Sequence, residues 1–262
     1  MMPEPVLKPL AGWSVVCLRP SAQQAAVRRA VQARGARHLA LPGLRLAPAP
    51  DEHAARAALR DALACHTVVF TSPAAVMFAA RLLPPRALRG QTAIAVGEGT
   101  ARALARHRVS SITPPPDAMH SDGVLALPHW RDAAGPVGLV TAPGGRGVIA
   151  AGLAARGMEL HRAEVYRRLP PRLDARHLRA LDASTPPRAA LVSSGEALER
   201  VLAALSDALR ARLLDATAVA SSLRLAELAR DRGFAGVLVA SAPTATAMLD
   251  ALVGHVGTAG FR

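Results

Sequence analysis

The sequence has little of what marks several large protein classes. Only 3% of its 262 residues are aromatic, so a hydrophobic core must come mainly from Ala, Leu and Val. The two cysteines, Cys17 and Cys65, are too few for a disulfide framework. No apolar run approaches the 18 residues that span a membrane, and the first ten residues contain no apolar stretch of a signal peptide. We therefore expect a protein of the reducing cytoplasm with no membrane partner.

Motifs for metals, nucleotides and acyl-enzyme chemistry are also missing. The nine histidines show no metal-ligand spacing. The segment GEGT at 97–100 has only two of the three glycines of a dinucleotide fingerprint, and no Gly-Lys-Ser/Thr phosphate loop or G-x-S-x-G elbow occurs. The sequence therefore predicts no metal and no cofactor.

Lysine is nearly absent, yet the chain is strongly basic. Lys8 is the single lysine beside 31 arginines, and the net charge is +13. Such a charge favours a polyanionic partner, either a nucleic acid or a polycarboxylate. The arginines are spread from Arg19 to Arg262 without interleaved aromatic residues, which is equally typical of a solvated surface. The charge alone leaves these three interpretations open.

Short apolar runs alternate with Ala/Leu/Arg-rich stretches along the chain. Their continuous hydrophobicity is typical of parallel strands covered on both faces, so the pattern predicts a doubly wound α/β fold. The expected strands are 13–18, 67–72, 93–97, 137–143, 189–194, 217–221 and 236–241. The expected helices are 21–34, 73–83, 98–107, 145–157, 195–209, 222–232 and 243–254.

An internal repeat predicts two similar domains. Residues 68–83 align with 190–205, and 93–107 align with 217–231. We expect one discontinuous α/β domain from 1–40 with 172–262, and a second from 49–165. The linkers at 41–48 and 166–171 contain or border prolines, which favours extended crossings.

Small and hydroxyl residues follow the expected strands. Ligands of open α/β sheets bind beyond the carboxyl ends of the strands, and helix N-termini there attract anions. The same Ser and Thr residues are also good helix caps, so capping is the simpler interpretation for some of them. The candidates are Thr71, Ser72, Gly97, Thr100, Gly144, Gly145, Arg146, Ser193, Ser194 and Ser221.

Tyr166 is the only tyrosine, and it lies at an expected crossing between domains. A phenol there can donate a proton or a hydrogen bond to a ligand. A half-buried tyrosine that only packs is the competing interpretation.

The order of several weak motifs resembles the uroporphyrinogen-III synthase family over nearly the whole chain. They are FTSPAAV (70–76), AVGEGTARAL (95–104), SDGVLAL (121–127), APGGRGVIAAGLAARG (142–157), EVYRR (164–168), VSSGEALERVL (192–202), SSLRLAELARDRGF (221–234) and VLVASAPTATAMLDAL (237–252).

The resemblance implies two parallel-sheet α/β domains joined by a two-stranded linker, with the active site in the interdomain cleft. It implies that the chain is a monomeric lyase of haem biosynthesis, which cyclises hydroxymethylbilane to uroporphyrinogen III. Water is lost, the last pyrrole (ring D) is inverted and no cofactor is used. The family tyrosine falls on Tyr166 and a family threonine on Thr100. The positions that match residues lining the cleft are Thr71, Ser72, Gly144, Gly145, Arg146, Ser193, Ser194 and Ser221.

Two positions depart from the family pattern. Ala74 stands where many relatives have Asn, and Arg224 stands where many have Thr. An arginine at 224 can instead bind a substrate carboxylate. These departures leave an inactive family member as an alternative. A non-catalytic two-domain anion-binding protein and a nucleic-acid-binding protein are the others.

Overall fold

The computed structural model describes residues 8–84, 90–144 and 147–259. The chain divides into two compact units. Unit 1 combines the residues up to Arg45 with those from Leu169 onward, and unit 2 is Leu46–Arg168. The chain passes between the units through β3 (Arg45–Pro48) and β9 (Tyr166–Leu169), which pair as a two-stranded sheet.

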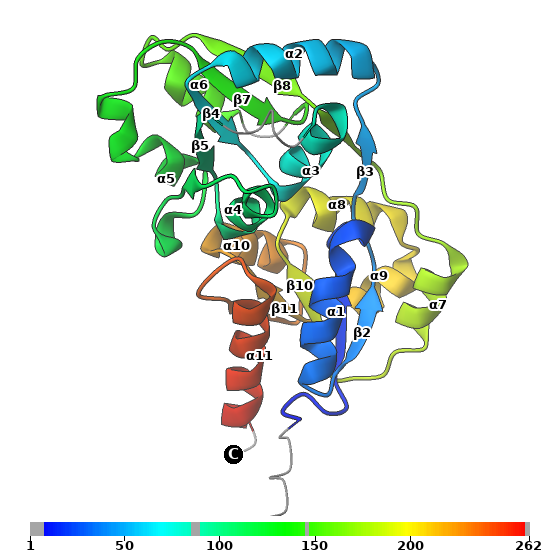
Figure 1. Ribbon diagram of the computed structural model, residues 1–262. Coiled ribbons are helices and arrows are strands. Elements are labelled where there is room, and N and C mark those ends of the chain that lie inside the picture. Colours follow the sequence, from blue (N-terminus) through cyan, green and yellow to red (C-terminus); the bar gives the residue numbers. More distant parts are fainter. Residues whose placement is uncertain (1–7, 85–89, 145–146, 260–262) are drawn as a thin grey trace, which may run out of the picture. The chain divides into compact units, whose positions relative to one another are not determined.

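Unit 2 is built on a five-stranded parallel sheet in the order β6-β5-β4-β7-β8. Figure 1 labels β4, β5, β7 and β8 of this sheet. The central strand β4 pairs with β5 on one side and β7 on the other, with Phe70 opposite Ala95 and Val140. The strands are β4 (Thr67–Phe70), β5 (Thr92–Ala95), β6 (Ser111–Ile112), β7 (Val137–Thr141) and β8 (Leu160–Glu164).

Helices cover both faces of this sheet. Successive side chains of each strand alternate between the two faces, so each strand contributes apolar residues to both. Val68 and Phe70 pack in one buried cluster with α2 (Glu52–Ala64), α3 (Pro73–Leu82) and α4 (Glu98–Ala105). Val69 points the other way, toward α5 (Ser121–Leu125) and α6 (Val148–Ala154). Gly138 of β7 lies against the carbonyl of Ala62, so a side chain there would collide with α2.

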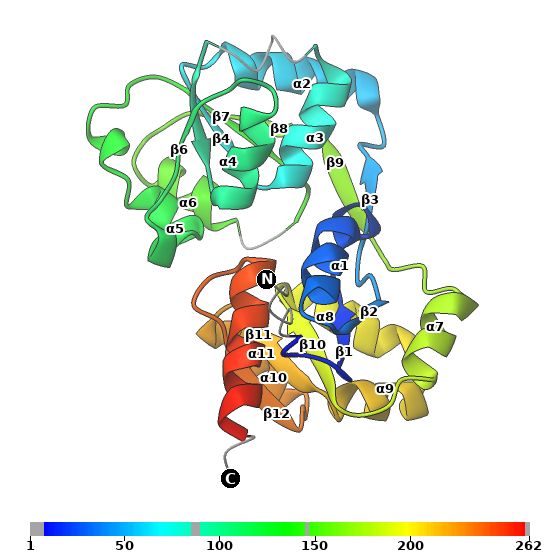
Figure 2. The ribbon, with the colours of Figure 1, turned by 60° about the horizontal axis from the view of Figure 1, so that its bottom comes forward.

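Unit 1 repeats this architecture with the order β12-β11-β10-β1-β2, all neighbours parallel. Its strands are β1 (Ser14–Cys17), β2 (Arg37–Ala40), β10 (Arg188–Val192), β11 (Thr217–Ala220) and β12 (Gly236–Val239). Helices α1 (Gln24–Ala33) and α11 (Ala245–Ala259) pack side by side on one face, as Figure 2 shows. The other face carries α7 (Ala175–Asp182), α8 (Gly195–Ala204), α9 (Asp207–Leu214) and α10 (Leu223–Asp231).

The two sheets share one winding pattern. In unit 2 the chain starts at β4, adds β5 and β6 on one side, and returns to add β7 and β8 on the other. Unit 1 has the same arrangement with β10 in the starting place and the N-terminal β1 and β2 on the side opposite β11 and β12. The fold is therefore two doubly wound parallel sheets, as the repeat and the family resemblance predict.

Several elements differ from the sequence prediction. The helix expected over 195–209 is two helices: α8 ends at Ala204, and α9 begins at Asp207 after Ser206. Strands β2 and β8 were not predicted, since polar side chains such as Arg37 and His161 interrupt the apolar pattern of these outer strands. Helix α2 was also missed, although Asp51 caps it by accepting from the backbone N–H of Ala54 at 2.9 Å.

Short helical turns complete the described structure. They are 3₁₀ helices at η1 (Ser21–Gln23), η3 (Pro116–Ala118) and η4 (Pro128–Arg131). The longest helix, α11, has 15 residues, and no described helix is long and apolar enough to cross a bilayer.

Candidate functional site

A cavity of about 230 Å³ opens at the carboxyl ends of β4 and β7 in unit 2. These two strands lie where the winding of the sheet reverses direction, and α/β sheets bind ligands at such a point. The cavity is smaller than the roughly 300–1,000 Å³ of pockets that enclose a drug-sized ligand, so it suits one part of a larger molecule. Its polar lining comes from Thr71, Ser72, Ser121, Thr141, Gly144, Arg162, Tyr166 and Arg168.

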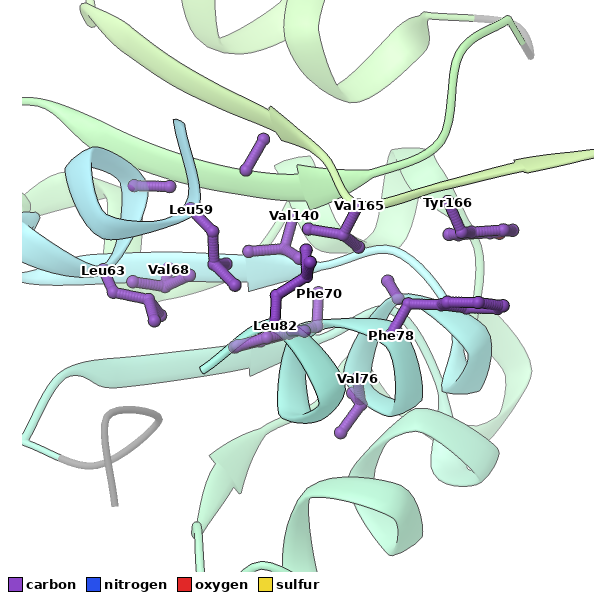
Figure 3. Packing of buried hydrophobic residues seen from close by; sticks show 14 of the residues in the cluster. Leu59, Leu63, Val68, Phe70, Val76, Phe78, Leu82, Val140, Val165 and Tyr166 are labelled. Atoms are coloured by element: carbon purple, nitrogen blue, oxygen red, sulfur yellow. The ribbon is translucent and has the colours of Figure 1, made fainter. Parts of the chain in front are cut away.

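Tyr166 begins β9 and presents its phenol at this cavity. The ring is 5% exposed and stacks on Phe78 of α3, with ring centroids 5.4 Å apart and an interplanar angle of 8°. Figure 3 shows this pair at one end of the apolar cluster of unit 2. The Tyr166 hydroxyl lies 3.1 Å from the Ser72 hydroxyl. Packing fixes the ring, while the phenol oxygen lies beside the Ser72 hydroxyl.

Thr71 and Ser72 form the turn between β4 and α3. The Thr71 hydroxyl donates to the carbonyl of Val140 at 3.2 Å and lies 3.0 Å from the Thr141 hydroxyl, which ties the ends of β4 and β7 together. The Ser72 hydroxyl accepts from the backbone N–H of Ala75 at 3.0 Å and so caps α3. Both predicted residues therefore line the cavity and also hold its walls.

Two arginines of the cavity were not predicted from the sequence. Arg168 lies two residues after Tyr166 on β9, so both side chains project from the same side of the strand, and Arg168 donates to the carbonyl of Pro143 at 2.9 Å. Arg162 of β8 lies 2.6 Å from a carboxylate oxygen of Glu164, and both side chains are partly exposed. The alternation within EVYRR was the signal that could have identified Arg168.

Gly144 stands in the turn after β7 with a positive φ of 73°, a conformation that glycine adopts without strain. The Arg168 guanidinium lies 3.9 Å from the place where a side chain would begin. A larger residue at this position would therefore be strained by the backbone conformation, while its first carbon would only make an ordinary contact with Arg168.

Gly97 and Thr100 lie at the start of the neighbouring helix α4. Neither is among the described residues that line the cavity. Thr100 is 3% exposed, and the backbone N–H after Gly97 donates to the sulfur of Met119 at 3.4 Å. Met119 packs against this turn. Ligand binding by Gly97 and Thr100 stays a prediction.

Unit 1 gathers the remaining candidates at the carboxyl ends of β10 and β11, which are paired neighbours. Ser193 and Ser194 follow β10, and Ser194 caps α8 by accepting from the N–H of Ala197 at 3.2 Å. The backbone N–H of Ser221 donates to Val192, which ties the two strand ends. Arg224 is exposed in the first turn of α10 near Gly195.

Gly145 and Arg146 lie outside the described residues. Ala74, the first departure from the expected family pattern, is 5% exposed within the apolar cluster of unit 2. Within the part of the chain that the structure describes, no group of three or more His, Cys, Asp and Glu residues could hold a metal ion.

Solved structures of low sequence identity share this fold. A uroporphyrinogen III synthase from the extremely thermophilic bacterium Thermus thermophilus matches 94% of this chain and 99% of its own, at 19% identity and a TM-score of 0.60. The enzyme from Helicobacter pylori 26695 covers 92% and 99% at 17% identity, also with a TM-score of 0.60.

Curated relatives align over part of the chain. The uroporphyrinogen-III synthases of Escherichia coli K12 and Salmonella typhimurium LT2 are each 33% identical over 158 residues. The alignment spans 59% of this chain and 64% of the length of each relative.

A family model matches most of the chain. The model described as uroporphyrinogen-III synthase HemD matches residues 25–250, which includes strands of both sheets, the cavity and Tyr166. This chain therefore belongs to the uroporphyrinogen-III synthase family.

Proposed function

We propose that this chain cyclises hydroxymethylbilane to uroporphyrinogen III, as a monomeric cytoplasmic lyase of tetrapyrrole biosynthesis. The observation that carries the proposal is the Tyr166 phenol. It lies within the residues that match the family model, and it lines a cavity at the point where the winding of the sheet reverses. A fixed phenol is a suitable proton donor for a departing hydroxyl group.

The chemistry needs few catalytic groups. The hydroxyl of the hydroxymethyl group on ring A leaves as water when it takes a proton from Tyr166, and the electron-rich pyrrole supplies the electrons, forming an azafulvene. Ring D then attacks the methylene carbon of the azafulvene through its own substituted position and forms a spiro intermediate. This intermediate fragments and recloses with ring D inverted. The proton that ring D loses on closure restores the phenol, so one water is released and the protein is unchanged.

Substrate binding is the other task, because the bilane also closes without inversion when it is not held. Its eight carboxylates suit hydroxyl groups, helix N-termini and arginines. In unit 2 we propose that Thr71, Gly144, Arg162 and Arg168 bind this substrate at the cavity. We propose carboxylate binding as well for Gly97, Thr100, Gly145, Arg146, Ser193, Ser194, Ser221 and Arg224. The protein's main contribution is then to hold one geometry of the chain.

The decisive experiment supplies hydroxymethylbilane to the purified protein and separates the uroporphyrinogen isomers by chromatography. We expect the type III isomer to accumulate in proportion to protein concentration. Formation of only the uninverted isomer, at the rate of the protein-free reaction, would contradict the proposal. Tight substrate binding without turnover would instead favour the anion-binding alternative.

A further inference from the structure

The Ser72 and Tyr166 hydroxyls lie 3.1 Å apart, and either oxygen can be the donor in this hydrogen bond. The direction matters, because the phenol has one proton. If Tyr166 donates to Ser72, that proton is occupied. If Ser72 donates to Tyr166, the phenol proton remains available to a ligand in the cavity.

The surroundings of Ser72 favour donation by the serine. A hydroxyl carries one donor and two acceptor positions, and the Ala75 N–H at the start of α3 already occupies one acceptor position. A hydroxyl that accepts a hydrogen bond becomes a stronger donor, since bonds in a chain polarise one another. The positive end of the α3 dipole acts in the same direction. The chain of donors then runs from the helix through Ser72 to the phenol oxygen.

The surroundings of Tyr166 hold the phenol in place to receive this bond. Stacking on Phe78 and burial of the ring leave it little freedom to turn away. Thr71, the other hydroxyl of the same turn, is engaged with Val140 and Thr141. Ser72 is therefore the hydroxyl of this turn that meets the phenol.

We propose that Ser72 is a positioning residue that acts through Tyr166: its hydroxyl donates to the phenol oxygen and directs the phenol proton into the cavity. The inference rests on the proposed function for its catalytic consequence. The same bond stabilises the negative charge that grows on the phenol oxygen as the proton leaves. Ser72 thus assists proton transfer without binding the substrate itself.

Ser72→Gly is the sharpest variant, because it removes the hydroxyl while glycine keeps most of the stability of a helix N-cap. We expect kcat for uroporphyrinogen III to fall roughly 10-fold, with KM little changed, since the lost bond acts mainly in the transition state. Ser72→Thr keeps both the cap and the hydroxyl and should restore most of the rate. In a Tyr166→Phe background, Ser72→Gly should reduce kcat no further, because the two residues act as one unit.

Ser222→Gly is a matched control. Ser222 caps α10 with the same extended backbone, at φ −166° and ψ 160° against φ −166° and ψ 161° for Ser72, and its hydroxyl accepts from the N–H of Leu225. The two variants lose equivalent caps. A loss of kcat that Ser222→Gly reproduces would show that capping alone explains the effect and would overturn the proposal.

Tyr166 is the only tyrosine, so the Raman spectrum provides a readout independent of turnover. The intensity ratio of the tyrosine Fermi doublet distinguishes a phenol that accepts a hydrogen bond from one that donates. We expect the accepting signature in the wild type and its loss in Ser72→Gly. A donating signature in the wild type would refute the proposed direction.

The two readouts separate the two hypotheses. A wild-type protein that forms no uroporphyrinogen III but shows the accepting signature would refute the proposed function and leave the hydrogen bond established. An active protein whose kcat is unaffected by Ser72→Gly would refute the positioning role alone.

Discussion

The two units share one strand order, but different side chains lie at the point where the winding of each sheet reverses. In unit 2, strand β9 brings Tyr166 and Arg168 to the ends of β4 and β7, where their side chains contact Ser72 and Pro143. In unit 1, the turns after β10 and β11 contain the serines that cap α8 and α10, and the exposed Arg224 stands beside them.

This difference shows which part of the fold supplies chemistry. A doubly wound sheet places strand ends and helix N-termini together, and both units do this. The phenol of Tyr166 and the guanidinium of Arg168 come from a strand outside either main sheet. We therefore expect unit 2 to control the rate of the reaction and unit 1 to contribute mainly to affinity.

Tyr166→Phe should have the largest effect. The ring and its stacking on Phe78 remain, so the fold should survive, while loss of the acid should lower kcat roughly 100-fold or more. Initial rates of uroporphyrinogen III formation, with circular dichroism to confirm folding, test this. A folded variant with a near wild-type rate would make Tyr166 purely structural, and the contrast between the units would lose its main support.

Arg168→Gln should have the next largest effect. The variant removes a charged donor to a substrate carboxylate and weakens the bond to Pro143, so we expect kcat/KM to fall roughly 10-fold or more, mainly through KM. Arg167→Gln is the matched control, because that exposed neighbour projects from the opposite side of β9. Equal losses in both variants would point to total charge rather than to the cavity.

Arg224→Ala tests the contribution of unit 1. An exposed arginine gains little from pairing with a carboxylate, about 0–1 kcal/mol, so KM should rise no more than about five-fold with kcat unchanged. Arg230→Ala, in the last turn of the same helix, is the charge-matched control. A large fall in kcat would contradict the division of roles between the units.

The smallest effect concerns pH and unit 1. Burial, with the nearby Arg28 charge, lowers the pKa of His38 from its ordinary value of 6.5. The unfolded chain then binds this proton more readily than the folded chain, so stability should fall as pH drops below about 6.5. Chemical denaturation between neutral pH and about pH 5 should show a shallower loss for His38→Gln than for the wild type. Parallel curves would assign the acid sensitivity to other groups.

The sequence determined the repeating strand and helix pattern, because parallel strands that are buried on both faces consist of continuous apolar residues. Examples are the residues that follow Thr67 in β4 and those that follow Arg188 in β10. It also identified the turns that line the cavity, since Ser72 and Gly144 are residue types that caps and left-handed turns require. Outer strands such as β8 were not predicted because polar residues at successive positions, such as His161 and Arg162, leave neither an apolar run nor a clear alternation.

Only the tertiary structure decided which candidates meet. Contacts such as Ser72 with Tyr166, 94 residues apart, and Arg168 with Pro143 depend on how β9 lies beside strand ends distant in sequence. Local composition does not encode such contacts, because a serine or an arginine has the same preference for helix, strand or turn whatever distant residue it contacts. The sequence by itself therefore determined the fold and the one phenol that can act as an acid. The partners that orient that phenol follow from the packing of α3 and β9.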